Sequence, residues 1–185
     1  MGSEKSGKII LGIDPGTNIF GFGILNVKGS VMSLLDMDIL SLDKINGHEL
    51  KLKQIFECTL SLIDLHHPDE LAIEAPFFGK NVQSMLKLGR AQGVAMAAAL
   101  SCEIPITEYA PKKVKQSDTG NGNASKEQVA RMLMSLLSIK EEPKLLDATD
   151  ALAVAVCHHF QKGKNPGKKK TWESFVKGNS GRVKG

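Results

Sequence analysis

The chain has 185 residues and a formal net charge of +4, and 42% of its residues are hydrophobic, which fits a globular protein with one domain-sized core. No run of about 18 apolar residues occurs, and the N-terminus lacks the apolar segment of a signal peptide, so we expect no membrane span and a cytoplasmic location. Cys58, Cys102 and Cys157 are odd in number and far apart. This pattern argues against a disulfide framework or a zinc site and predicts reduced thiols in or near the core.

Positive charge is concentrated at the C-terminus. Residues 161–185 hold eight basic residues and one acid, a net charge of +7 that leaves −3 for the rest of the chain. Their Gly, Asn, Pro and Ser content is typical of disorder. We therefore expect a disordered extension over residues 1–7, a folded domain over 8–160 and a basic flexible tail over 161–185. Such a tail either attracts polyanions or only aids solubility.

The first predicted strand ends in a carboxylate. Ile9–Ile13 is an almost continuous apolar run, as in a strand buried on both faces, and Asp14 closes it before the turn signal Pro15-Gly16. The β-rich run Ile19–Leu25 follows after a few residues and predicts a hairpin. Asp14 is then either a functional group at a strand end or an ordinary turn former.

A third strand and a helix follow. Ser30–Leu40 alternates loosely, and the apolar residues of His48–Leu65 have helical spacing. His66-His67-Pro68 ends this helix. Adjacent histidines before proline fit a polar helix terminus better than a metal site, because no further ligand has suitable spacing.

A second buried strand repeats the pattern of the first, since Leu71–Ile73 is closed by Glu74. The loop that follows contains Phe77 and Phe78, which either fold back onto the core or stack against nucleic-acid bases. Asn81 is placed to cap the next helix. The Gly- and Ala-rich half of that helix, Gly89–Ala99, allows either close packing within the chain or a helix-to-helix dimer contact.

The rest of the chain predicts one more strand and two helices. Pro105–Thr107 is a short strand, followed by a basic segment with Lys112, Lys113 and Lys115. Ser125 and Gln128 form a capping box that opens the first of the two helices.

Two further carboxylates begin the last predicted helix, Leu145–Phe160. Asp147 and Asp150 are three residues apart, so they lie about 60° apart around the helix and share a face. Acids in a first turn are also favoured by the helix dipole, which is an alternative explanation for this pair alone.

The two strand-end acids and the two helix acids together predict a metal site. Two unit charges about 4 Å apart repel by about 4 kcal/mol at an effective dielectric constant near 20, so packing alone would not gather four of them. Mg²⁺ takes oxygen ligands, and a pair of ions can activate water and stabilise a leaving oxygen in phosphodiester hydrolysis. Acids with basic surroundings therefore favour a nuclease.

The motifs IILGIDPGT, LAIEAPFFGKN, LKLGRAQGVA, YAPKKVKQ and DATDALAVAV resemble, in order and spacing, the RuvC-type Holliday-junction resolvases of the ribonuclease H-like superfamily. The resemblance covers residues 8–159. It implies an α/β fold with a five-stranded mixed sheet and helices on both faces. It also implies a homodimeric, Mg²⁺-dependent endonuclease that cuts four-way DNA junctions with paired nicks, with two ions per site, Mn²⁺ as a substitute and a branch-migration helicase complex as partner.

The resemblance also implies residue roles. The catalytic and metal-binding acids fall on Asp14, Glu74, Asp147 and Asp150, the junction-contacting aromatic on Phe77, and basic DNA contacts on Lys115 and Lys126. We add Lys80, Lys87, Lys112 and Lys113 to the expected DNA-binding set. Pro76 beside Phe77 and the Lys-rich tail depart from the family pattern.

Two other functions compete with this one. GIDPGT also resembles the first phosphate loop of actin-like ATPases and sugar kinases, but a second domain with its own Asp-Gly loop does not fit into 185 residues. A junction-binding protein without catalysis is the other alternative, and the presence of all four acids argues against it.

Overall fold

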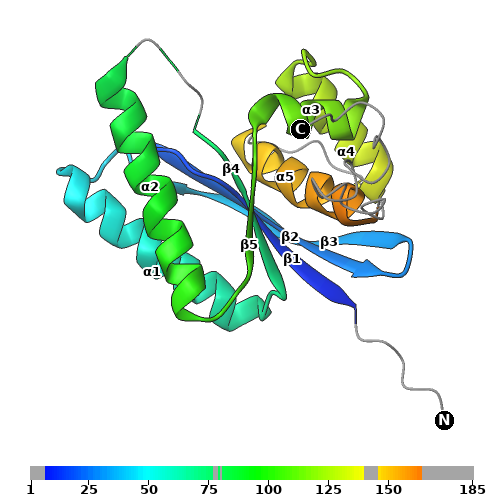
Figure 1. Cartoon of the computed structure of the whole chain (residues 1–185), viewed down its shortest axis with the longest axis horizontal. Helices are drawn as coiled ribbons and strands as arrows, with labels where there is room; N and C mark the ends of the chain where they lie inside the picture. Colours follow the sequence, from blue (N-terminus) through cyan, green and yellow to red (C-terminus); the bar gives the residue numbers. More distant parts are fainter. Residues whose placement is uncertain (1–6, 77–78, 80, 140–145, 164–185) are drawn as a thin grey trace, which may run out of the picture.

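The computed structural model describes residues 7–76, 79, 81–139 and 146–163. The described residues contain one five-stranded sheet with the order β3-β2-β1-β4-β5 (Figure 1). The strands are β1 (Lys8–Asp14), β2 (Ile19–Lys28), β3 (Val31–Ser41), β4 (Glu70–Glu74) and β5 (Ile106–Tyr109). The helices are α1 (His48–His66), α2 (Val82–Ser101), α3 (Pro111–Thr119), α4 (Lys126–Leu137) and α5 (Leu146–Gly163).

The sheet is mixed, as expected. β1, β2 and β3 are antiparallel neighbours joined by short turns, whereas β4 pairs in parallel with β1, and β5 in parallel with β4. The carboxyl ends of β1 and β4 therefore lie at the same edge of the sheet. Asp14 is the last residue of β1 and Glu74 is the last residue of β4, so the topology brings these two acids together.

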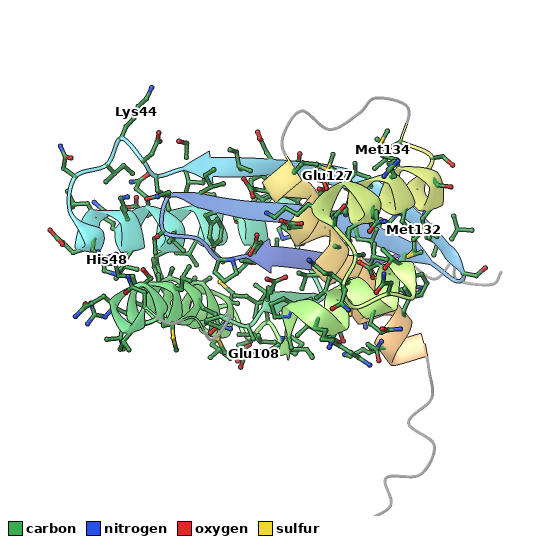
Figure 2. All side chains as sticks on the ribbon, turned by 90° about the horizontal axis from the view of Figure 1, so that it is seen from above. Lys44, His48, Glu108, Glu127, Met132 and Met134 are labelled. Carbon is green, nitrogen blue, oxygen red and sulfur yellow. The ribbon has the colours of Figure 1, made fainter. Side chains whose placement is uncertain are left out.

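Helices cover both faces of the sheet, as Figure 1 shows, with α1 and α2 on one side and α3, α4 and α5 on the other. Alternate strand residues separate into two apolar cores. Ile10 and Leu25 pack with the α5 side, whereas Leu11, Ile13 and Ile24 pack with α1 and α2. Seen from above, His48 at the start of α1 lies at the opposite end of the molecule from Met132 and Met134 on α4 (Figure 2).

Glycines allow α5 to lie directly on the sheet. A Cβ added at Gly12 would be 2.2 Å from the Ala151 carbonyl oxygen, and one at Gly21 would be 2.5 Å from the Asp147 carbonyl oxygen. A Cβ at Gly23 would be 2.7 Å from the Cα of Leu152. Only residues without a side chain permit this approach, so the glycines of β1 and β2 set the height of α5 above the strands.

Three expectations from the sequence need comment. The helix α3 was not predicted, although Pro111 occupies its first turn, where proline is favoured. Cys102 is exposed, so the expectation of a core or near-core position is wrong for this thiol, because it follows α2 as its C-cap residue. His67 is a left-handed helix cap, and His66 lies 3.3 Å from Asp36, which confirms a polar helix terminus.

Within the described part of the chain, no helix has both the length and the apolar character needed to cross a bilayer. Of the expected terminal segments 1–7 and 161–185, residues 1–6 and 164–185 lie outside the described residues, whereas residues 161–163 form the end of α5. The expected DNA contacts Phe77 and Lys80 also lie outside the described residues.

Candidate active site

Four carboxylates from three elements meet at one edge of the sheet. Asp14 and Glu74 end the neighbouring parallel strands β1 and β4. Asp147 and Asp150 lie in the first two turns of α5, which the close approach to Gly12 and Gly21 holds against the same strands. The two strand-end acids and the two helix acids, which are far apart in the sequence, are thus brought together in the fold.

The strand-end acids share a small cavity and repel their neighbours. A cavity of about 170 Å³ is lined by Asp14 and Glu74 together with Pro15, Ala75, Pro76 and Leu88. Burial, followed by repulsion from Asp150, raises the pKa of Asp14 to about 6. Burial, followed by repulsion from Asp14 and Asp150, raises the pKa of Glu74 to about 8. Mutual repulsion of this kind shows that the carboxylates form one electrostatic unit.

Lys126 supplies the compensating charge. Its Nζ lies 2.9 Å from Asp147 Oδ1 and 2.5 Å from Asp150 Oδ2, so one ammonium bridges both helix acids. Burial works against the charged form of Lys126, but the hydrogen bonds to Asp150 and Asp147 outweigh it, and the pKa is raised. Burial also raises the pKa of Asp150, although its hydrogen bond with Lys126 opposes this effect.

Lys126 is held in place by the start of α4. Ser125 accepts a hydrogen bond from the backbone N–H of Gln128, and the Gln128 side chain accepts one from the backbone N–H of Ser125. This capping box confirms the prediction from the sequence and fixes the first turn of α4 beside α5.

A buried glutamine positions Glu74 from the opposite face. Gln92 of α2 donates from Nε2 to the main-chain oxygen of Glu74 at 3.3 Å and to Glu108 Oε2 at 2.8 Å. The amide therefore ties the end of β4 to α2 and to β5. Sequence reasoning missed Gln92, because a polar residue in a small-residue helix gives no sign that it will be buried.

The donor set suits a hard divalent cation, since Mg²⁺ prefers carboxylate oxygens. Among the residues that the structure describes, however, no group of three or more Asp, Glu, His or Cys side chains is arranged closely enough to hold a metal ion. Lys126 bridges two of the four acids instead. An ammonium at this position marks where positive charge relieves the repulsion among the carboxylates.

The expected basic DNA contacts divide into three groups. Lys126 lies in the site. Lys115 is close enough that its positive charge partly offsets the rise in the pKa of Glu74 and of Asp150. Lys112 and Lys113 are exposed on α3. Lys87 is exposed on α2 and lines a second cavity, whose lining contains none of the four acids.

Comparisons with known proteins match most of this chain to one family. Residues 10–158 match the family model described as "Crossover junction endodeoxyribonuclease RuvC". The chain is 64% identical over 182 residues to the protein of that name from Christiangramia forsetii, covering 97% of this chain and 95% of the relative. It is 60% identical over 177 residues to the protein from Cytophaga hutchinsonii, covering 96% and 88%.

A solved structure gives the same result. The "T. thermophilus RuvC in complex with Holliday junction substrate" aligns with a TM-score of 0.78 and 32% identity, covering 84% of this chain and 94% of that one. The yeast mitochondrial Holliday junction resolvase Ydc2 shares the fold at 13% identity, with a TM-score of 0.62.

Proposed function

Because the chain belongs to the RuvC family of crossover junction endodeoxyribonucleases, we propose that it hydrolyses phosphodiester bonds at four-way DNA junctions. The observation that carries this proposal is the group of four carboxylates around Lys126 at the carboxyl edge of β1 and β4. An ATPase fragment is not supported, since neither the family match nor the close relatives point to one.

We propose that Asp14, Glu74, Asp147 and Asp150 hold Mg²⁺, two ions per site, with Mn²⁺ as a substitute. Bound divalent ions supply activation of water and stabilisation of the leaving 3′ oxygen. Because metal ligands must be deprotonated, a cation that binds at neutral pH would displace a proton mainly from Glu74, whose pKa is about 8. Lys126 holds Asp147 and Asp150 in place until then and offers positive charge to an approaching phosphate.

The test is incubation of the protein with a labelled four-way junction, with and without Mg²⁺. We expect paired nicks with Mg²⁺ and none in its absence, and no cutting of a linear duplex of the same sequence. Replacing Asp14 by Asn should abolish cutting while junction affinity holds or rises, because repulsion of phosphate is relieved. A protein that binds the junction but never cuts it would support the non-catalytic alternative.

We also propose a homodimer, which would present two such sites to one junction. An exposed stripe on α2 supports this, because Val82, Leu86 and Leu100 are 65%, 51% and 60% exposed. Gly93 lies on the same stripe, and nothing is within 4 Å of a Cβ added there. Val94 and Met96, in contrast, pack partly against the core under α2.

Leu86→Lys should therefore give folded monomers that nick one strand at a time. The matched control is Leu136→Lys on α4, an apolar residue that is also exposed but lies outside this stripe. Sedimentation velocity distinguishes the two states, and an intact dimer for Leu86→Lys would place the interface elsewhere.

A further inference from the structure

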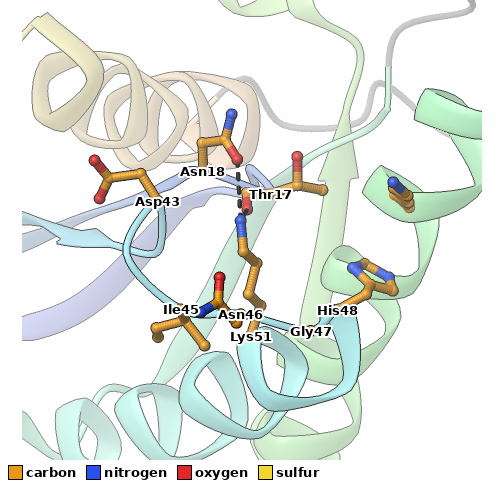
Figure 3. A pocket seen from close by; sticks show the side chains of 9 residues that line it. Thr17, Asn18, Asp43, Ile45, Asn46, Gly47, His48 and Lys51 are labelled. Carbon is orange, nitrogen blue, oxygen red and sulfur yellow. Dashed lines mark hydrogen bonds between the residues drawn. The ribbon is translucent and has the colours of Figure 1, made fainter.

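A second cavity, of about 350 Å³, lies beside the candidate active site. It lies between the turn that joins β1 and β2, the loop between β3 and α1, the start of α1, and α2 (Figure 3). Its lining is mostly polar and consists of Thr17, Asn18, Asp43, Ile45, Asn46, Gly47, His48, Lys51 and Lys87.

Positive charge dominates this cavity. Lys51 crosses it and donates to the Thr17 carbonyl oxygen and to Asn18 Oδ1, both at 3.1 Å (Figure 3). An ammonium has three donors, so Lys51 keeps one for a ligand. Among the described residues, neither Lys51 nor Lys87 forms a salt bridge.

The acid in the lining does not neutralise these lysines. The Asp43 carboxylate points away from Lys51 in Figure 3, and it accepts a hydrogen bond from the Ser41 hydroxyl. The hydrogen bond with Ser41 lowers the pKa of Asp43 and keeps its charge directed toward the strand end.

His48 adds a hydrogen-bonding group without a partner. Its Nε2 is buried in the structure, and no hydrogen-bond partner is found for it among the described residues. Burial lowers the pKa of His48, and the positive charges of Arg90 and Lys87 lower it further. The cavity therefore combines an imidazole in need of a partner with a positive field, which an anion would satisfy and a cation would not.

The cavity is close to the proposed cutting site. Thr17 is three residues after Asp14, which places their Cα atoms at most about 10 Å apart. On α2, Leu88 lines the cavity of Asp14 and Glu74, while its neighbour Lys87 lines this one. Phosphates of one strand follow each other every ~3.4 Å along the helix axis, so a separation of at most about 10 Å corresponds to at most about three nucleotides.

We propose that this cavity binds one backbone phosphate of the strand being cut, about one to three nucleotides from the scissile bond, through Lys51, Lys87 and His48. This inference rests on the proposed function. Ile45 is the one large apolar residue of the lining, which contains no Phe, Tyr or Trp to offer a broad surface for a base, so the site suits a phosphate better than a whole nucleotide. A fixed second phosphate would orient the strand over the four acids.

Single phosphates can be neutralised chemically to test this. A series of junctions, each with one methylphosphonate within five nucleotides of the cut, is titrated with wild-type protein in EDTA. We expect affinity to fall about tenfold at one position, as for the loss of one charge-assisted hydrogen bond, and to change little at the others. The double variant Lys51→Gln, Lys87→Gln should lose affinity on the unmodified junction and show no further loss at that position.

Two controls separate binding from folding. Lys53→Gln removes the same charge from the opposite side of α1, where Lys53 pairs with Glu57, and should keep the wild-type positional pattern. Lys87→Gln alone leaves the hydrogen bonds of Lys51 with the β1–β2 turn intact, so it should melt like the wild type and still weaken the positional effect. The slope of log affinity against log salt should flatten by about 0.9 for each phosphate that a variant no longer neutralises.

The outcomes are distinct. Wild-type protein that binds the junction but shows no sensitive position, or a double variant with the wild-type pattern, overturns the phosphate site and leaves the proposed function standing. Wild-type protein with no affinity for junctions overturns both.

Discussion

The close packing of α5 on Gly12, Gly21 and Gly23 leads to a quantitative prediction about the position of the helix acids. In Gly21→Ala, the new Cβ would lie 2.5 Å from the Asp147 carbonyl oxygen and 3.4 Å from the Ala151 Cβ. Ordinary contact begins near 3.4 Å, so the start of α5 must move away from the sheet by about 1 Å. That movement carries Asp147 and Asp150 away from Asp14.

A displacement of this size has a large effect on chemistry and a modest one on stability. Misplacing catalytic groups by about 1 Å can cost about 10²-fold in rate. Overpacking of a core costs about 1–3 kcal/mol in unfolding free energy. We therefore expect Gly21→Ala to cut a four-way junction about 10²-fold more slowly in single-turnover assays with Mg²⁺, while its junction affinity in EDTA stays near the wild-type value.

Ile55→Val is the matched control for reduced stability. Ile55 is fully buried on the opposite face of the sheet, and this truncation typically costs about 0.5–1.5 kcal/mol. It should leave cutting unchanged when assays are run well below the melting temperature. Cutting by Gly21→Ala within threefold of the wild type would refute the idea that these glycines set the position of the helix acids.

Two further predictions concern buried polar groups. Asp118 is 6% exposed, and neither carboxylate oxygen has a partner among the described residues. Burial raises its pKa to about 8, so the folded state holds this proton more tightly than the unfolded state does. The free energy of unfolding should therefore fall by about 1.4 kcal/mol per pH unit as the pH rises from about 4 to 8. Asp118→Val should remove this slope, and equal pH profiles of the urea midpoints in EDTA would contradict it. Gln92→Leu removes the hydrogen bonds that join the end of β4 to α2, so it should lower the unfolding free energy by about 1 kcal/mol. It should also raise the Mg²⁺ concentration needed for half-maximal cutting, because Glu74 is then held less firmly. An unchanged Mg²⁺ titration would exclude a positioning role for Gln92.

Local patterns predicted most of the elements. The apolar runs that end in Asp14 and Glu74 became β1 and β4, because a strand buried on both faces must be apolar throughout. The Asn81 cap was also correct, since Asn81 Oδ1 accepts from the Ser84 N–H at 3.1 Å. The helix α3 was missed because it is nine residues long and rich in lysine, so it has too few apolar positions to show a period.

Features that depend on packing between distant segments could not be predicted in this way. Gly12, Gly21 and Gly23 are ordinary strand interruptions in the sequence, and only the position of α5 gives them a role. Asp118 follows the basic segment around Lys112, where no helix was predicted, and only the structure shows that it is a buried residue of α3. The cavity around Lys51 combines residues from three separate segments. Thr17 and Lys87 belong to motifs that the sequence shows, but neither motif indicates that these segments meet around one cavity.

The two ends of β4 show how the fold separates stability from function. Glu70 begins the strand and is also buried, which would raise its pKa, but hydrogen bonds from Lys162, Lys8 and His158 outweigh burial and lower it to about 2. Glu74 ends the same strand and faces Asp14 and Asp150, and its pKa is about 8. A glutamate carboxylate is thus stabilised as an anion at the first residue of β4 and destabilised as an anion at the last. Under the proposed function, a divalent cation at the Glu74 end would relieve this repulsion, whereas Glu70 is already paired and would gain little from a bound ion.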